Sequence, residues 1–176
     1  MALAVMLYLP LLFERVRGIR RQDGKHSDEY VKNRVESIYF DVTHFYNSIS
    51  GEAAAVPEAW PDFDGMYCSD AWNGLLAQME DGFFDCNYWT GYSGLGFLYV
   101  NKVELIDRTG DMATVSMTLH NGDRAVPMLL VMVFERDDWR IDNMTYYWNE
   151  KPSTRYYDWR QEMESAKETN SQEKNS

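Results

Sequence analysis

Residues 95–148 read LGFLYVNKVELIDRTGDMATVSMTLHNGDRAVPMLLVMVFERDDWRIDNMTYYW, and they carry the clearest structural signal in the chain. Turn-forming residues at 107–111, 121–122 and 136–138 separate four strand-like segments. Asn121-Gly122 predicts a hairpin, because a type I′ turn needs positive φ at both central residues and Asn-Gly tolerates this best. The stretch therefore predicts an antiparallel meander, with strands over 97–106, 112–120, 126–134 and from Trp139 onward.

The residues before this meander predict helices. Ser27 followed by Asp28 and Glu29 provides a capping hydroxyl and acidic side chains for a first helical turn. Apolar residues then recur at steps of three and four, which is typical of a helix with one buried stripe. The stripe comprises Val31, Val35, Ile38, Val42, Phe45 and Ile49. Shorter helices are predicted over 63–68 and after the Ser69-Asp70 cap, the second of them ending at Gly82.

Helices followed by a meander indicate an α+β domain in which the helices cover one face of the sheet. The predicted strand over 112–120 has one polar face, whereas the strand over 126–134 is apolar on both. Its second face would need a cover from the N-terminal segment, the C-terminal segment or a second subunit. We divide the chain into an apolar and basic segment (1–25), the α+β domain (26–150) and a C-terminal extension (151–176). The extension is expected to hold a short helix over 156–167 and a disordered polar tail from Glu168.

Composition limits the class of protein. The 176 residues suit one domain, and 45% hydrophobic and 15% aromatic content excludes a disordered chain. A net charge of −11 disfavours nucleic acid, because binding phosphates requires clustered Lys and Arg. Residues 1–25 carry a net charge of +3, so the remainder carries −14. This acidic body is compatible with a cationic partner.

The N-terminal segment indicates export or membrane attachment. Residues 1–13 are apolar but too short to span a bilayer, which takes about 20 residues. They resemble the core of a secretory signal, although the basic cluster over 15–21 follows them instead of preceding them. A start site upstream, an anchor at an anionic membrane, and a helix docked on its own cytoplasmic domain all remain open.

The polar residues form no metal or cofactor motif. Cys68 and Cys86 permit one disulfide or two free buried thiols, and the three histidines are widely separated. We therefore expect no metal site and no cofactor. The segment 62–65, Asp-Phe-Asp-Gly, has some likeness to a calcium loop, but its glycine stands fourth instead of sixth. A solvated acidic helix start is the better interpretation.

Three segments carry a resemblance to a known family: the helix over 30–50, Met66-Tyr-Cys-Ser-Asp-Ala-Trp72 and Asp138-Trp-Arg-Ile-Asp142. Together they resemble an uncharacterised bacterial family of the nuclear transport factor 2-like superfamily, which includes SnoaL-like and ketosteroid-isomerase-like proteins. The resemblance covers about residues 28–146. It implies a cone-shaped α+β roll, in which a curved antiparallel sheet wraps the first helix and leaves a pocket at the open end. Relatives of this kind are often exported, and many members have no enzymatic activity.

Four aromatic residues are candidates for lining such a pocket, namely Tyr67, Trp72, Trp89 and Tyr99. Core packing explains the first two equally well, and Trp139 is expected in the core. We predict no catalytic residues. Asp41 lies off the helix stripe, Asp142 alternates with the apolar residues of the last strand, and His120 ends a hairpin strand.

Three functions follow as hypotheses. The first is a non-catalytic domain that binds a small apolar ligand or a protein. A second copy of the chain, bound through the outer face of the sheet to form a homodimer, is one such protein partner. The second is an acidic, immunity-type antagonist of a basic protein. The third is an isomerase- or lyase-like enzyme, which would need a carboxylate base and a tyrosine in a deep pocket. An interior filled by the protein's own aromatic side chains would favour the first.

Overall fold

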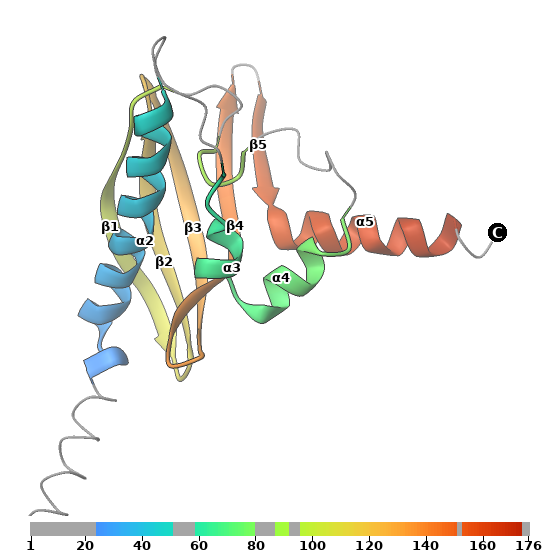
Figure 1. Cartoon of the computed structure of the whole chain (residues 1–176), viewed down its shortest axis with the longest axis horizontal. Helices are drawn as coiled ribbons and strands as arrows, with labels where there is room; N and C mark the ends of the chain where they lie inside the picture. The colour runs from blue at the N-terminus through green and yellow to red at the C-terminus, as the bar shows by residue number, and fades with distance from the viewer. Residues whose placement is uncertain (1–23, 51–58, 80–86, 92–95, 151–152, 174–176) are drawn as a thin grey trace, which may run out of the picture.

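The structure, a computed structural model, describes residues 24–50, 59–79, 87–91, 96–150 and 153–173. The helices are α2 (Asp28–Ile49), α3 (Phe63–Tyr67), α4 (Asp70–Leu76) and α5 (Trp159–Glu173). The strands are β1 (Leu98–Thr109), β2 (Met112–Asn121), β3 (Arg124–Glu135), β4 (Asp138–Glu150) and β5 (Ser153–Asp158). They form one antiparallel sheet in the order β1-β2-β3-β4-β5 (Figure 1). The predicted α+β class and the four-stranded meander are confirmed.

The hairpin at Asn121 forms, but its turn differs from the prediction. Asn121 pairs with Arg124, so Gly122 and Asp123 are the central residues. Of the three residues Asn121 to Asp123, Gly122 alone has positive φ, at 60°. A type II′ turn places glycine at this first central position, whereas the predicted type I′ turn would need positive φ at Asn121 as well. The hairpin signal was therefore correct and the turn type was wrong.

The turn of the β3–β4 hairpin has two non-glycine residues with positive φ. Glu135 pairs with Asp138, and both central residues, Arg136 and Asp137, have positive φ, at 51° and 63°. Positive φ at both central residues is typical of a type I′ turn, which suits the twist of the two strands, although non-glycine side chains disfavour this left-handed region. Each side chain also contacts another element. Arg136 forms an ion pair with Asp70 at the start of α4, and Asp137 accepts from Lys25 Nζ at 2.7 Å.

Helix α2 buries the predicted stripe against the sheet. Ser27 caps it by accepting from the Tyr30 backbone N–H, as expected. The first four stripe residues are fully buried, and the last two are half-buried against the core. Tyr39 and Tyr46 are also buried, because each hydroxyl has a partner inside the fold. Tyr39 contacts Met128 Sδ at 3.8 Å, and Tyr46 accepts from Asn87 Nδ2 at 2.5 Å.

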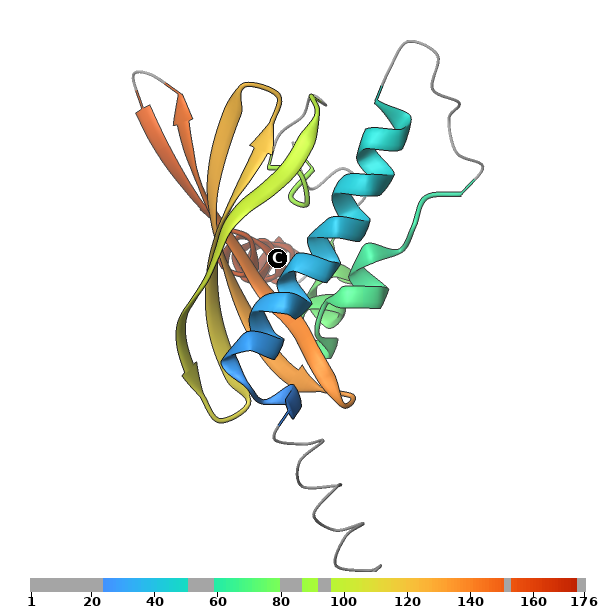
Figure 2. The same cartoon turned by 90° about the vertical axis from the view of Figure 1, so that its left-hand side faces the viewer.

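The two faces of the sheet have different environments. In Figure 2, α2, α3 and α4 all lie on one side of the sheet. The strand residues that face them are the buried set, which includes Val115, Leu130, Ile141 and the predicted core residue Trp139. Among the residues that the structure describes, no helix covers the outward-facing positions of β2 and β3. Most of these are half-exposed or exposed.

The C-terminal extension belongs to the fold. Residues 153–158 pair with β4 as β5, although the sequence predicts a helix from residue 156 onward. The predicted helix begins at Trp159 instead of Tyr156, with Asp158 Oδ1 accepting from the Gln161 N–H. The helix continues through the polar stretch from Glu168 to Glu173, because Glu, Lys and Gln residues favour a helix. Trp159 and Met163 join the core.

Candidate functional site

Three of the four predicted ligand-binding residues meet inside the domain. Tyr67, Trp72 and Trp89 have exposed fractions of 9%, 0% and 3%. Phe63 joins two of them, with its ring centroid 6.1 Å from Tyr67 and 5.8 Å from Trp89. All four side chains belong to the hydrophobic core. Trp89 belongs to the core although it lies in the irregular segment 87–91, whose glycine-rich surroundings in the sequence suggest a residue outside the core.

Tyr99, the fourth candidate, lies apart from this cluster. It is 44% exposed on the outer face of β1, and its ring stacks on His120 of β2 at 4.3 Å with an interplanar angle of 3°. The two residues are direct cross-strand partners. His120 is therefore more than the end of a hairpin strand, because it completes an aromatic pair on the outer face. The structure separates Tyr99 from the other three candidates by the thickness of the sheet.

Asp64 is the carboxylate that the sequence did not identify. Its Oδ2 accepts from the Tyr88 hydroxyl at 2.5 Å, and its Oδ1 accepts from Trp72 Nε1 at 3.0 Å and Cys68 Sγ at 3.6 Å. The interpretation as a solvated helix start suits Asp62, which is exposed and caps α3 by accepting from the Gly65 N–H. It is wrong for Asp64, which lies on the inward side of the same short helix.

Burial shifts the acid–base properties of this group. Loss of hydration raises the pKa of Asp64, and the hydrogen bonds from Tyr88, Trp72 and Cys68 oppose this only in part. Burial, together with the nearby Asp64 charge, also raises the pKa of Tyr88 and of the Cys68 thiol. Cys68 is a free thiol, protonated and fully buried, so it is not an activated nucleophile. Cys86 lies outside the described residues.

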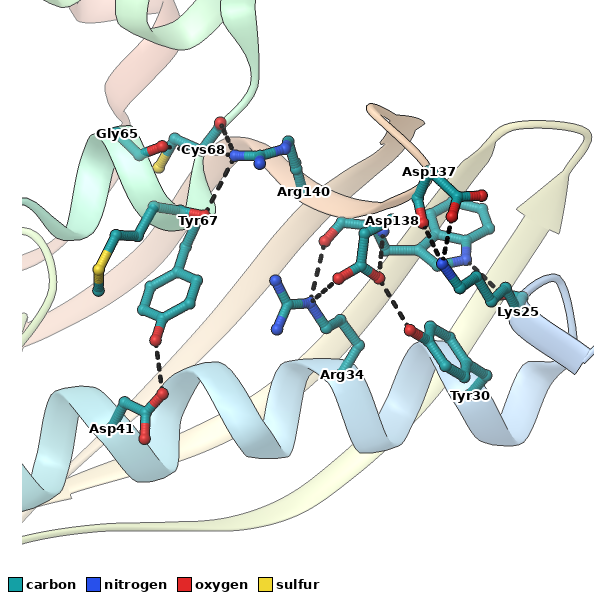
Figure 3. A network of polar contacts seen from close by, with 12 residues as sticks. Lys25, Tyr30, Arg34, Asp41, Gly65, Tyr67, Cys68, Asp137, Asp138 and Arg140 are labelled. Atoms are coloured by element: carbon teal, nitrogen blue, oxygen red, sulfur yellow. Dashed lines mark hydrogen bonds and ion pairs between the residues drawn. The ribbon is translucent and has the colours of Figure 1, made fainter.

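A second polar network runs along α2 (Figure 3). Tyr67 donates to Asp41 Oδ2 at 2.5 Å, and the guanidinium of Arg34 lies 5.5 Å from the Tyr67 ring centre. Arg34 Nε is also 3.1 Å from Asp138 Oδ2, whose other oxygen accepts from the Tyr30 hydroxyl at 3.0 Å. Burial and the Asp41 carboxylate raise the pKa of Tyr67 to about 12. This network fastens α2 to α3 and to the β3–β4 hairpin.

Asp142 has a structural role. Ser69, which caps α4, donates to Asp142 Oδ1 at 2.6 Å, and Arg160 of α5 forms an ion pair with Oδ2. Asp142 therefore joins α4, β4 and α5. Its side chain points away from the buried Ile141, as the alternation predicts, but it is bound to two neighbours and is not a free solvated group. Asp85, for which the sequence also predicts no catalytic role, lies outside the described residues.

Where β2 and β3 pair with each other, their outward positions lack charge. They are Met112, Thr114, Ser116, Thr118, His120, Ala125, Pro127, Leu129, Val131 and Val133. The next outward position of β3 is the charged Glu135, which ends the strand. No Asp, Glu, Lys or Arg stands among these ten, although 26% of the chain is charged. Charged residues appear on the flanking strands, with Glu104 and Asp107 outward on β1 and Arg140 outward on β4. This uncharged outer face is the second candidate site.

Neither site has the ligand set of a metal centre. Within the described ranges, no three His, Cys, Asp or Glu side chains are placed to hold a metal ion. No helix in that same part of the chain is both long and apolar enough to cross a membrane. Comparisons with models of protein families, with curated proteins and with solved structures gave no significant match.

Proposed function

We propose that this chain is a non-catalytic binding domain that binds a protein through the outer face of its sheet, and that its partner there is a second copy. The observation that carries the proposal is the uncharged outer face of β2 and β3, which no described helix covers. Non-obligate and homodimeric interfaces lose charge at the centre and keep it at the rim. The distribution of charge over β1 to β4 has this form.

The lack of charge on this face favours a second copy over a basic partner. Two chains of net charge −11 repel one another, and like charges brought together in an interface cost several kcal/mol. Contact through the two central strands avoids that cost. An antagonist of a basic protein would instead need carboxylates on the binding face, and the stretch over which β2 and β3 pair has none at its outward positions.

The available area is adequate. Strands of 10 and 12 residues, at about 3.3 Å per residue, make a face about 30 Å long. With the flanking strands β1 and β4 included as its charged rim, four strands at a spacing of about 4.8 Å give the face a width of about 20 Å, or roughly 600 Å² in projection. A stable interface buries about 800 Å² per partner, which is of the same order.

The interior supports a non-catalytic role. An isomerase of the kind considered would need a carboxylate that can reach a substrate. Here Asp64 accepts a 2.5 Å hydrogen bond from Tyr88 beside the packed aromatic rings of the core. Asp41, which is exposed on α2, accepts a 2.5 Å hydrogen bond from Tyr67. Replacing Asp41 or Asp142 by Asn should therefore change no reaction rate. Turnover of any substrate that one of these replacements abolishes would favour an enzyme.

The finer architecture is part of the same proposal. We propose a cone-shaped roll of the nuclear transport factor 2-like type, and the long helix α2 against the inner face of an antiparallel sheet supports it. We also propose export or membrane attachment through residues 1–25, based on their apolar and basic sequence. Fractionation of cells carrying the native locus tests this, and recovery of the full-length chain only in the soluble cytoplasm would contradict it.

The experiment for the binding face introduces a charge at its centre. Val131→Glu in the full chain should shift the sedimentation coefficient from that of a dimer to that of a monomer, because two buried carboxylates would face each other. Val131→Thr, which keeps the β-branched shape without charge, should remain dimeric. A Val131→Glu chain that is folded and still dimeric would exclude this face as the interface.

A further inference from the structure

The chain contains the dipeptide Asn-Gly twice, as Asn73-Gly74 in α4 and as Asn121-Gly122 at the β2–β3 turn. An Asn-Gly dipeptide is prone to lose the side-chain amide, because glycine has no side chain to hinder attack by its own backbone nitrogen on the asparagine. Each pair is therefore a reactive site that the fold either exposes or blocks. The contacts around Asn121 and Gly122 show which of these applies at the turn.

The reaction at such a pair exchanges ammonia for water. The Gly122 nitrogen, after losing its proton to a solvent base, attacks Cγ of Asn121 and forms a new C–N bond. The Cγ–Nδ2 bond breaks, and Nδ2 takes up a proton and leaves as ammonia. One water molecule then opens the resulting succinimide ring at either of its two carbonyl carbons, which gives aspartate or isoaspartate at position 121.

The attacking nitrogen is blocked in the folded chain. The Gly122 N–H donates to the Phe97 carbonyl oxygen at 3.0 Å, and an amide held in this way loses its proton only when the hydrogen bond opens. Asn121 is also the last residue of β2 and pairs with both Leu98 and Arg124. Closure of the ring requires ψ of roughly −120° at the asparagine, whereas a strand has ψ of about +135°, which is about 100° away. The attack therefore requires the turn to open.

The carboxamide that is attacked, in contrast, is already polarised. Asn121 Oδ1 accepts from the Gly96 N–H at 2.6 Å. Attack at Cγ places negative charge on this oxygen, and a hydrogen bond donated to it stabilises that charge, as in an oxyanion hole. The Gly96 contact therefore does not protect the carboxamide. The hydrogen bond from Gly122 to Phe97 is the contact that keeps the pair unreactive.

We propose that Asn121-Gly122 is a deamidation site gated by the fold, which stays intact while Gly122 is bonded to Phe97 and is converted in chains whose β2–β3 turn has opened. Asn121 is 5% exposed in the closed turn, so either product would bury a carboxylate there, and isoaspartate also adds a methylene group to the backbone. Conversion therefore opposes closure of the turn. The buried side of β2 carries this site, so the proposal does not depend on the proposed dimer.

Asn73-Gly74 provides a comparison within the same molecule. The helical ψ of about −42° at Asn73 is also roughly 80° from the value that ring closure needs. The first residue of α4, Asp70, is paired with Arg136 of the β3–β4 turn, at the opposite end of β3 from Gly122. A change confined to the β2–β3 turn should therefore alter the reaction of Asn121 and leave that of Asn73 as it is.

Peptide mapping of the full chain by mass spectrometry, after incubation at neutral pH, tests the gate. Conversion of Asn121 to aspartate and isoaspartate should be slower in buffer than in guanidinium chloride by about tenfold or more, because only chains with an opened turn react in the folded state. Equal rates of conversion in the two solutions would overturn the proposal.

Gly96→Ala locates the gate. A Cβ at residue 96 would lie 2.5 Å from the Gly122 nitrogen, so Gly122 must shift and its bond to Phe97 weakens. This variant should convert Asn121 about tenfold faster than wild type in buffer and Asn73 at the wild-type rate. Gly110→Ala, which strains the β1–β2 turn instead, is the matched control and should leave both rates unchanged. A Gly96→Ala chain that converts Asn121 no faster than wild type, or that accelerates both sites equally, would overturn the gate.

Discussion

Tyr67 of α3 and Asp41 of α2 are joined by a 2.5 Å hydrogen bond across 26 residues of sequence. The bond holds the short helix α3 against the long one and raises the pKa of Tyr67, which burial also raises, to about 12. The phenol therefore binds its proton more tightly in the folded chain than in the unfolded one. Its contribution to stability is fully present below pH 10 and is lost as pH rises toward 12.

Tyr67→Phe tests this linkage. The variant should be slightly less stable than wild type at neutral pH, by about 1 kcal/mol, because one hydrogen bond is lost. The difference should narrow between pH 10 and about 12, where only wild type loses the contribution of this phenol. Urea unfolding at a series of pH values measures it. A difference that stays constant across that window would contradict the role of the Tyr67 proton.

The centre of the helix stripe gives a second prediction. Val42 is fully buried, so Val42→Asp places an unpaired carboxylate in the core and should cost about 3 kcal/mol or more. Ser37→Asp, on the exposed face of the same helix, should change the free energy of unfolding by about 0.5 kcal/mol or less. If Val42→Asp unfolds at the same temperature as the control, the assignment of the stripe is wrong.

Trp89 gives a third prediction, the reverse of what its irregular sequence context suggests. With 3% of its surface exposed among aromatic rings, Trp89→Ala should cost about 3–5 kcal/mol through the cavity it leaves. Phe40→Ala is the control, because Phe40 is 68% exposed. Chemical denaturation of both variants decides the matter. A small and equal cost for the two would place Trp89 outside the core.

The β3–β4 turn gives a fourth prediction. Arg136 has a φ of 51°, which glycine adopts freely and β-branched residues avoid. Arg136→Gly removes an exposed ion pair with Asp70 and relieves strain, so its stability should stay within about 1 kcal/mol of wild type. Arg136→Val removes the same ion pair and keeps the strain, so it should be clearly less stable. Equal stability of the two variants would show that the turn is not strained.

Alternation and capping in the sequence were sufficient to predict the helices and the four-stranded meander. The apolar residues of β2 and α2 follow the periods of a strand and a helix, and Ser27 and Ser69 form the expected caps. The predicted buried stripe of α2 left out Tyr39 and Tyr46, because a phenol counts as polar in a sequence pattern until its hydrogen-bond partner is known. Strand β5 was not predicted, because its pairing with β4 overrides the local sequence preference of residues 153–158.

The candidate sites were less predictable. The sequence grouped Tyr99 with three core aromatics, since it shows composition but not the side of the sheet on which a ring lies. Asp64 and Asp62 stand two apart in one acidic segment, and only the rotation of α3 turns one inward and the other toward solvent. The sequence predicted the uncharged outer face of β3, because that strand is apolar on both sides. It did not predict which segment or subunit covers that face.

The most direct measurement of the central claim is the mass of the unaltered full chain in solution. Sedimentation equilibrium from about 1 to about 100 μM brackets an affinity in the micromolar range. The proposed interface predicts a mass that rises with concentration toward twice 20.6 kDa. A mass that remains at 20.6 kDa across the whole range would contradict the proposal that the outer face binds a second copy.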